Sequence, residues 1–213
     1  METFLQDRRL DVYAELLAEK SLMYNLTAVP PSDYRELHFR DSLELLNAAE
    51  FEGRRVIDVG SGAGFPGVPL KLAVPSIELT ALDATKKRSE FLRLLSKKLG
   101  VGYEVIWARA EDAGAQAEHR ESYDIAVSRA VASLPQLAEM CLPFVKPGGV
   151  FLAPKGNEIE AELENAREII TKLGGKIRET RPYFRGNIVV IDKISATPEV
   201  YPRKWKKIVN GKT

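Results

Sequence analysis

A glycine-rich segment, Asp58-Val59-Gly60-Ser61-Gly62-Ala63-Gly64-Phe65-Pro66-Gly67, follows directly on the apolar pair Val56-Ile57. A short apolar run ending in such a segment is typical of a strand that leads into a helix, because glycine permits positive φ and lets a ligand approach the backbone. Four glycines in eight residues are more than a tight turn requires. The sequence therefore predicts a ligand-binding loop at the end of a buried strand.

The spacing of the glycines fits more than one class of ligand. Gly62 to Gly67 formally matches the dinucleotide pattern G-x-G-x-x-G, but there the first glycine follows the strand at once, whereas Asp58-x-Gly60 occupies the strand end here. The loop also lacks the Gly-Lys-Ser/Thr of an ATP-binding P-loop. A carboxylate facing the ligand would repel pyrophosphate and suit a cationic amino acid or a sulfonium. The spacing Asp-x-Gly-x-Gly-x-Gly resembles the first motif of Rossmann-like S-adenosylmethionine methyltransferases, so we expect Asp58, Gly60, Gly62, Gly64 and Phe65 to bind S-adenosylmethionine.

Strand-like and helical stretches alternate after Arg55, which favours a parallel sheet covered on both faces. The expected strands are Val56–Val59, Ile77–Leu82, Tyr103–Trp107, Tyr123–Val127 and Val150–Leu152, separated by helices near Pro66–Ala73, Lys86–Leu99, Leu134–Val145 and Glu158–Leu173. Two further runs, Lys176–Phe184 and Asn187–Ile194, are separated only by Arg185-Gly186 and must pair antiparallel. The sequence thus predicts an α/β fold with a seven-stranded, mostly parallel sheet and an antiparallel C-terminal hairpin, the Rossmann-like class I methyltransferase variant.

The chain is expected to have three parts. Residues 1–50 form an N-terminal helical extension, residues 51–200 the S-adenosylmethionine-binding domain, and residues 201–213 a basic C-terminal tail. The tail has no acidic residue, although the whole chain of 213 residues has a net charge of only +1. A neutral protein with one basic end can still bind phosphate locally.

Composition excludes several classes of protein. With 45% hydrophobic and 29% charged residues, the chain has the balance of a globular protein. One cysteine and 2 histidines allow neither a disulfide framework nor a Cys/His zinc cluster, so we expect no metal. No apolar run approaches the roughly 20 residues of a membrane span, and the N-terminus does not resemble a signal peptide. We expect a cytoplasmic monomer without a membrane partner.

Two more acidic residues follow predicted strands. Asp83 ends the second strand, where a carboxylate can accept hydrogen bonds from both hydroxyls of a ribose. Ala110-Glu111 follows the third strand, where an adenine edge is typically bound. These positions are what an adenosine-containing cofactor needs.

Motifs along nearly the whole chain resemble those of the RsmG family, also called glucose-inhibited division protein B. They are Asn25-Leu26-Thr27, His38-Phe39-Arg40-Asp41-Ser42, Asp58–Leu70, Arg109-Ala110-Glu111, Ser128-Arg129-Ala130-Val131-Ala132, Pro147-Gly148-Gly149, Lys155-Gly156 and Tyr201-Pro202-Arg203-Lys204. The resemblance implies an S-adenosylmethionine-dependent methyltransferase acting on N7 of one guanine in bacterial 16S ribosomal RNA or the small subunit. It also implies a cofactor site at Gly60, Phe65, Ala110, Glu111 and Arg129.

The sequence departs from the family pattern at both ends. The N-terminus is shorter than usual, and Trp205-Lys206-Lys207-Ile208 stands where the family continues with a small-residue, glycine-containing stretch. An aromatic residue among cations can stack on a base while its neighbours contact phosphates. The expected RNA contacts are Asn25, His38, Lys155, Arg185, Arg203 and Lys204.

Methylation at guanine N7 needs no general base, because this nitrogen carries an in-plane lone pair and no proton. We therefore expect catalysis by positioning, and Arg129, after the fourth strand, is the best candidate for that role. Two alternatives stay open from the residues alone: a class I methyltransferase with another substrate, and a nicotinamide-dependent oxidoreductase that uses the G-x-G-x-x-G overlap.

Overall fold

The computed structural model describes residues 4–129 and 132–210, so Ala130, Val131 and the last three residues of the basic tail lie outside it. Its centre is a seven-stranded sheet in the order β3-β2-β1-β4-β5-β7-β6. The strands are β1 (Arg55–Val59), β2 (Glu78–Asp83), β3 (Glu104–Trp107), β4 (Tyr123–Val127), β5 (Val145–Lys155), β6 (Gly175–Tyr183) and β7 (Gly186–Lys193). Strands β1 to β5 pair in parallel, and β7 is antiparallel to both of its neighbours. The fold predicted from the sequence is confirmed.

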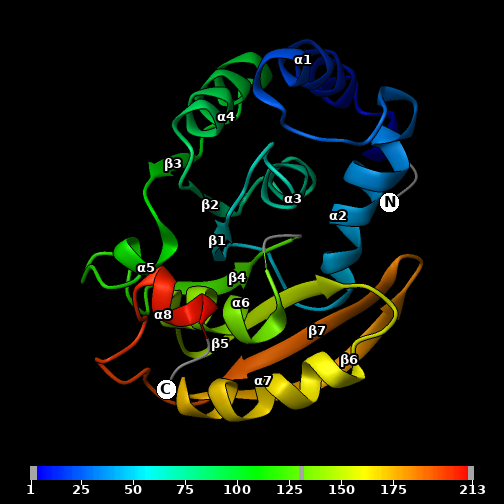
Figure 1. Cartoon of the computed structure of the whole chain (residues 1–213). Helices are drawn as coiled ribbons and strands as arrows, with labels where there is room; N and C mark the ends of the chain where they lie inside the picture. The colour runs from blue at the N-terminus through cyan, green and yellow to red at the C-terminus, as the bar shows by residue number, and fades with distance from the viewer. Residues whose placement is uncertain (1–3, 130–131, 211–213) are drawn as a thin grey trace.

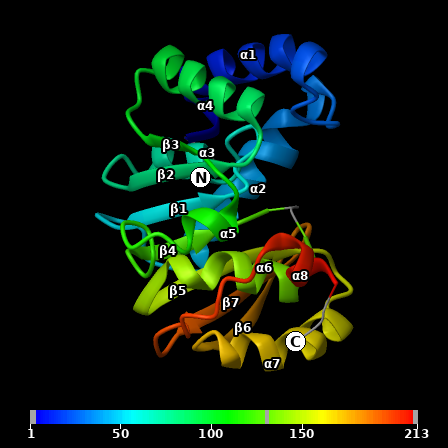
Figure 2. The same ribbon diagram turned by 60° about the vertical axis from the view of Figure 1, so that its left-hand side comes forward.

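Side chains that alternate along the strands build one core on each face of the sheet. In β1, Val56 belongs to one core and Ile57 to the other. The helices are α1 (Arg8–Tyr24), α2 (Asp41–Leu43), α3 (Gly67–Ala73), α4 (Lys86–Leu99), α5 (Ala110–Ala113), α6 (Leu134–Cys141), α7 (Glu160–Lys172) and α8 (Trp205–Val209). Figures 1 and 2 show α1 beside α4 at one end of the molecule and α7 beside β6 at the other. Among the residues described, no helix is long and apolar enough to cross a membrane.

The N-terminal extension is packed onto the sheet rather than separate from it. Leu10, Tyr13 and Leu17 of α1 are fully buried and share a core with Phe91 and Leu92 of α4. Burial of these side chains therefore stabilises both the N-terminal extension and the domain that contains α4. Helix α4 ends at Gly100, which adopts the left-handed conformation that favours glycine at a helix C-terminus.

Several boundaries differ from the predicted ones. Strand β5 is longer than the predicted apolar run Val150–Leu152, because its first residues, from Val145, lie in a Pro-Gly-Gly segment without an apolar pattern. The C-terminal tail forms the short helix α8, which Figures 1 and 2 show beside α6. Ile208 of this helix is 5% exposed and belongs to the second core. The tail is thus part of the folded domain up to the last described residue.

Candidate active site

Two adjoining cavities lie at the carboxyl ends of the parallel strands. The larger has a volume of about 730 Å³ and the smaller about 210 Å³, and both are lined by Gly60, Asp83 and Ala84. These residues follow or end β1 and β2, next to the boundary between β1 and β4, where the strand order reverses because the chain returns from β3 to the other side of β1. Ligands of open α/β sheets bind at such a point.

Asp58 is hydrogen-bonded to the glycine-rich loop. It lines neither cavity, contrary to the expectation that its carboxylate faces the ligand. Its side chain is fully buried, and Oδ2 accepts hydrogen bonds from Ser61 Oγ (2.7 Å) and Gly67 N (2.9 Å). Burial raises the pKa of this carboxyl to about 6, although the two hydrogen bonds oppose the shift. Strand alternation explains the difference, since Asp58 points toward α3 rather than past the strand end.

The glycines of the loop have different roles. Gly62 lines the larger cavity with a φ of +58° and donates its N–H to Asp83 Oδ2 (2.9 Å). Gly64, with a φ of +97°, lies against Tyr13 and Val68, where a Cβ would not fit. Gly64 therefore allows close packing of α1 on the loop and is not among the residues that line either cavity. Phe65 does line the larger cavity, as expected.

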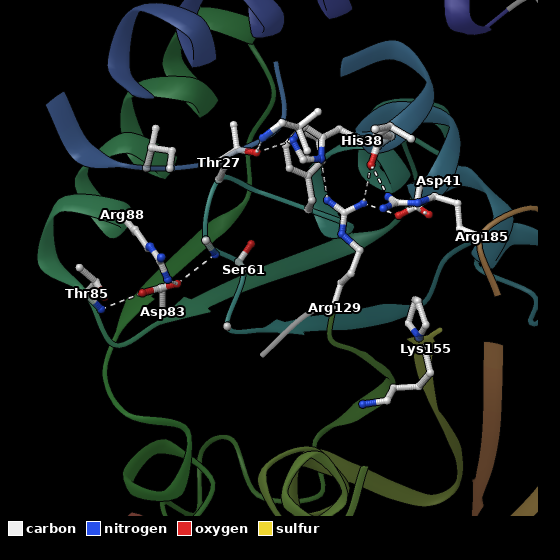
Figure 3. A pocket seen from close by; sticks show the side chains of 18 of the residues that line it. Thr27, His38, Asp41, Ser61, Asp83, Thr85, Arg88, Arg129, Lys155 and Arg185 are labelled. Atoms are coloured by element: carbon white, nitrogen blue, oxygen red, sulfur yellow. Dashed lines mark hydrogen bonds and ion pairs between the residues drawn. The ribbon is translucent and has the colours of Figure 1, made fainter. Parts of the chain in front are cut away.

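Asp83 connects the two cavities. Its Oδ2 accepts from Gly62, its Oδ1 accepts from Thr85 N (2.7 Å), and the residue is 3% exposed. Figure 3 shows this carboxylate between Thr85, Arg88 and the loop. Each carboxylate oxygen has a further lone pair, so the group can still accept hydrogen bonds from a ligand.

The smaller cavity is walled by the segment after β3 and by α8. Ala110 and Glu111, which the sequence predicts to bind the cofactor, line it together with Arg109 and Trp205. Glu111 is 4% exposed, and its Oε1 accepts hydrogen bonds from Arg109 Nε (2.7 Å) and Trp205 N (3.3 Å). Leu82, Ala108 and Met140 add apolar surface. A flat, apolar group with polar edges suits such a cavity.

A chain of polar side chains crosses the larger cavity (Figure 3). Arg129 Nη1 donates to Asp41 Oδ2, and Arg129 Nη2 donates to His38 Nδ1 (3.1 Å). Asp41 is 2% exposed, and the Arg129 guanidinium also lies 5.1 Å from the centre of the Phe65 ring. On the other side of His38, Nε2 is 2.8 Å from Thr27 Oγ1. Residues far apart in the sequence thus hold Arg129 in one orientation.

His38 is a neutral hydrogen-bonding residue in this chain. Arg129 has only donors, so Nδ1 of His38 must accept and Nε2 must carry the proton. The ring lies on a π-helical turn, Arg35–Arg40, and stacks on Phe65 at 4.3 Å. Burial, together with the positive charges of Arg129 and Arg185, lowers the pKa of His38 to about 3.

Exchange of His38 for asparagine is expected to reduce the loss of stability in acid. Unfolded, this histidine titrates near pH 6.5, so between about pH 6.5 and 3 the unfolded state binds more protons and stability falls as the pH falls, by about 1.4 kcal/mol per pH unit. We expect the difference in unfolding free energy between wild type and His38→Asn to shrink from pH 7 to pH 4.5. Urea unfolding at a series of pH values measures it. A pH-independent difference would contradict a neutral, buried His38, and the contribution of Asp58 cancels because both proteins contain it.

The remaining expected RNA contacts differ in their surroundings. Lys155 and Arg185 both line the larger cavity: Lys155 Nζ pairs with Glu162 (2.9 Å), and Arg185 Nη1 lies 3.6 Å from Asp41 Oδ1. Asn25 is exposed, ends α1 in the left-handed conformation and does not line the cavity. Its observed role is that of a helix C-cap, for which asparagine is suited.

The two tail residues also differ. Arg203 donates from N and Nε to Glu139 Oε1 (2.8 and 2.9 Å) and from Nη2 to Oε2 (2.7 Å), and Glu139 is 1% exposed. Its charge is therefore neutralised inside the protein, contrary to the expectation of a phosphate contact. Lys204 is exposed and pairs at the surface with Asp112 (2.6 Å).

Some site residues were not singled out from the sequence. Thr27 and Asp41 belong to motifs of the resemblance and Arg88 to α4, but only the structure brings them to the larger cavity. Trp205, which the sequence offered only as an aromatic residue among cations, lines the smaller cavity. Within residues 4–129 and 132–210, no group of three or more His, Cys, Asp or Glu side chains could hold a metal ion.

Comparison with known proteins identifies the family. The family model of rRNA small subunit methyltransferase G (GidB) matches residues 6–185. Ribosomal RNA small subunit methyltransferase G of Alkaliphilus metalliredigens is 44% identical over 208 residues, covering 93% of this chain and 87% of the relative. The protein of the same name from Acetivibrio thermocellus is 41% identical over 214 residues, covering 95% of this chain and 88% of the relative.

Solved structures share the fold at low sequence identity. A 16S rRNA N2 methyltransferase of T. Thermophilus in complex with AdoMet and guanosine has a TM-score of 0.52 at 17% identity, covering 75% of this chain and 40% of that chain. M. jannaschii TYW2 in complex with AdoMet has a TM-score of 0.56 at 15% identity, covering 72% of each chain. The resemblance seen in the motifs is confirmed: this chain belongs to the family of rRNA small subunit methyltransferase G.

Proposed function

We propose that this protein transfers a methyl group from S-adenosylmethionine to N7 of one guanine in 16S ribosomal RNA, with the adenosine part in the smaller cavity and the target base in the larger. The observation that carries the assignment is the position of Asp83, which lines both cavities and holds the loop between them. A cofactor that spans both sites would place its reactive methyl group near this junction. As a methyltransferase of ribosomal RNA, the protein acts in the cytoplasm, and we propose that it does so as a monomer.

The residues of the smaller cavity fit the adenosine part of the cofactor. Asp83 keeps free lone pairs for the ribose hydroxyls, and Glu111 has a second carboxylate oxygen that accepts no hydrogen bond from the described part of the chain. From the glycine-rich loop, Gly60 lines both cavities, and Gly62 and Phe65 line the larger one. When bound, S-adenosylmethionine supplies an electrophilic methyl group on a sulfonium.

In the larger cavity, Arg129 is suited to orient the base. Within the described chain it uses three of its five N–H groups, on Asp41, Leu37 and His38, which leaves two that can donate to an acceptor such as guanine O6. Its pairing with Asp41 also offsets the guanidinium charge next to a base that becomes positive. The neutral His38 removes no proton, consistent with a nucleophile that has none to lose. Catalysis then rests on orientation.

The direct test is methyl transfer from labelled S-adenosylmethionine to 16S rRNA, or to small subunits, from cells that lack this modification. Label recovered as 7-methylguanosine at one site is the expected result, and label at another atom or no label in either substrate would contradict the proposal. Thermal unfolding separates the cofactor classes: S-adenosylhomocysteine should raise the melting temperature, whereas NADH should not.

RNA binding is expected to depend on cations around the larger cavity. Arg88, Arg129, Lys155 and Arg185 line it against two acidic residues, Asp41 and Asp83, so its rim is positive. The variant Lys155→Ala/Arg185→Ala should bind RNA more weakly, and the slope of log affinity against log salt concentration should shrink by about 1.4, at roughly 0.7 for each of two lost phosphate contacts. Filter binding across a salt series measures the slope.

A matched control removes two positive charges elsewhere. Lys97 and Lys98 are exposed in the last turn of α4, which runs back to the opposite edge of the sheet. Lys97→Ala/Lys98→Ala should leave the slope unchanged. Equal slopes for both double variants would show that the cavity rim does not contact phosphates.

A further inference from the structure

Trp205 occupies an unusual position for a residue of a basic tail. It lines the smaller cavity with Ala110 and Glu111 and with the apolar residues Leu82 and Ala108. Its neighbours in sequence, Lys204 and Lys206, are exposed, whereas Trp205 is half-buried. The indole is thus the part of the tail that belongs to the cavity.

Trp205 is held in place by two residues of the segment that follows β3. Its backbone N–H is bound by Glu111, and the Arg109 guanidinium lies 5.7 Å from the ring centre. Arg109 and Glu111 are themselves hydrogen-bonded at 2.7 Å. The ring is therefore held by the same segment that forms the rest of the cavity wall.

The chain before Trp205 is anchored at several points. Arg203 pairs with the buried Glu139, and Arg120 donates to the carbonyls of Tyr201 (2.8 Å) and Thr197 (2.6 Å). Lys193, whose side chain is fully buried, donates to Thr197 Oγ1 at 2.6 Å. These contacts hold the segment from Thr197 to Arg203 on the rest of the domain and position the tail before any ligand binds. A prearranged aromatic wall loses little freedom on binding.

We propose that Trp205 contacts the adenine ring of the cofactor, and that the C-terminal segment is a wall of the nucleoside site. This inference rests on the proposed function, because it takes the ligand of the smaller cavity to be adenosine. A flat aromatic wall and apolar surroundings suit a purine, since an aromatic ring can stack on its face or contact its edge. The polar rim of Glu111 leaves an acceptor for an N–H of the base.

The test compares Trp205→Ala, Trp205→Phe and the control Val209→Ala, which truncates an exposed apolar residue of the same helix. Calorimetry with S-adenosylhomocysteine should show about tenfold weaker binding for Trp205→Ala, restored in large part by Trp205→Phe and unchanged in Val209→Ala. The same factor is expected with 5′-methylthioadenosine, which lacks the amino-acid end. In methyl transfer, KM should rise for S-adenosylmethionine and not for RNA.

Fluorescence provides a second readout that does not depend on activity. The chain has 2 tryptophans, so Trp107→Phe leaves Trp205 as the sole indole, and Trp205→Phe leaves Trp107. S-adenosylhomocysteine should change the emission of the first protein and not that of the second. Equal affinity of wild type and Trp205→Ala, or a rise in KM for RNA alone, would overturn the inference. Absence of binding to the wild type would instead overturn the proposed function itself.

Discussion

Replacement of Arg129 by alanine is expected to lower methyl-transfer turnover by about 10² to 10³, while the binding of S-adenosylhomocysteine changes little. Removal of one prearranged hydrogen-bond donor at a reacting group typically lowers turnover by about this factor. Arg129 lines the larger cavity and not the smaller one, so its removal affects the base more than the adenosine part. Single-turnover kinetics at saturating RNA and cofactor measures the effect. Turnover at the wild-type rate in a folded protein would refute the assigned role.

The controls separate orientation from folding. Arg129→Ala leaves the buried Asp41 without its main partner, which can destabilise the protein by about 3–5 kcal/mol. The double variant Asp41→Asn/Arg129→Met removes both charges and should fold while turnover stays low. Arg185, which approaches Asp41 from the more exposed side, is the matched arginine: Arg185→Ala should weaken RNA binding but keep turnover at saturating RNA.

The parts of the fold that were predictable are those encoded by neighbouring residues. The apolar strands show as short runs, and the two residues Arg185-Gly186 are too few for a helical crossover, so the hairpin followed from length alone. The packing of the tail did not, because it depends on the pairing of Arg203 with Glu139, 64 residues away. A basic sequence with no acid nearby gave no sign of a buried acidic partner.

The same distinction applies to the site. Gly62, Phe65 and Asp83 were expected near the cofactor because they follow or end strands, and all three line the larger cavity. The contacts of Arg129 with Asp41 and His38 span 88 and 91 residues, so no local pattern contains them. The only signal was that Arg129 belongs to one motif of the resemblance, and His38 and Asp41 to another. The predicted orientation of Asp58 was wrong, because the sequence shows that it lies in a strand but not that Ser61 and Gly67 donate hydrogen bonds to its side chain.

Replacement of Asp83 by alanine is expected to weaken the binding of S-adenosylhomocysteine by at least about a hundredfold. Two effects add. The variant loses charge-assisted hydrogen bonds to the ribose, each worth about 1.5–3 kcal/mol. It also leaves the N–H groups of Gly62 and Thr85 without their acceptor, so the loop between the two cavities is no longer held in place. Isothermal calorimetry measures the affinity directly.

Two variants show whether the effect is specific to this carboxylate. Asp83→Asn keeps one acceptor oxygen, so its affinity should lie between those of the wild type and the alanine variant. Asp112→Ala removes a surface carboxylate after β3, paired with the exposed Lys204, and should bind like the wild type. Undiminished affinity of Asp83→Ala would mean that the cofactor does not cross the junction of the two cavities. In that case the smaller cavity would not be the adenosine site, and the test of Trp205 would be expected to fail with it.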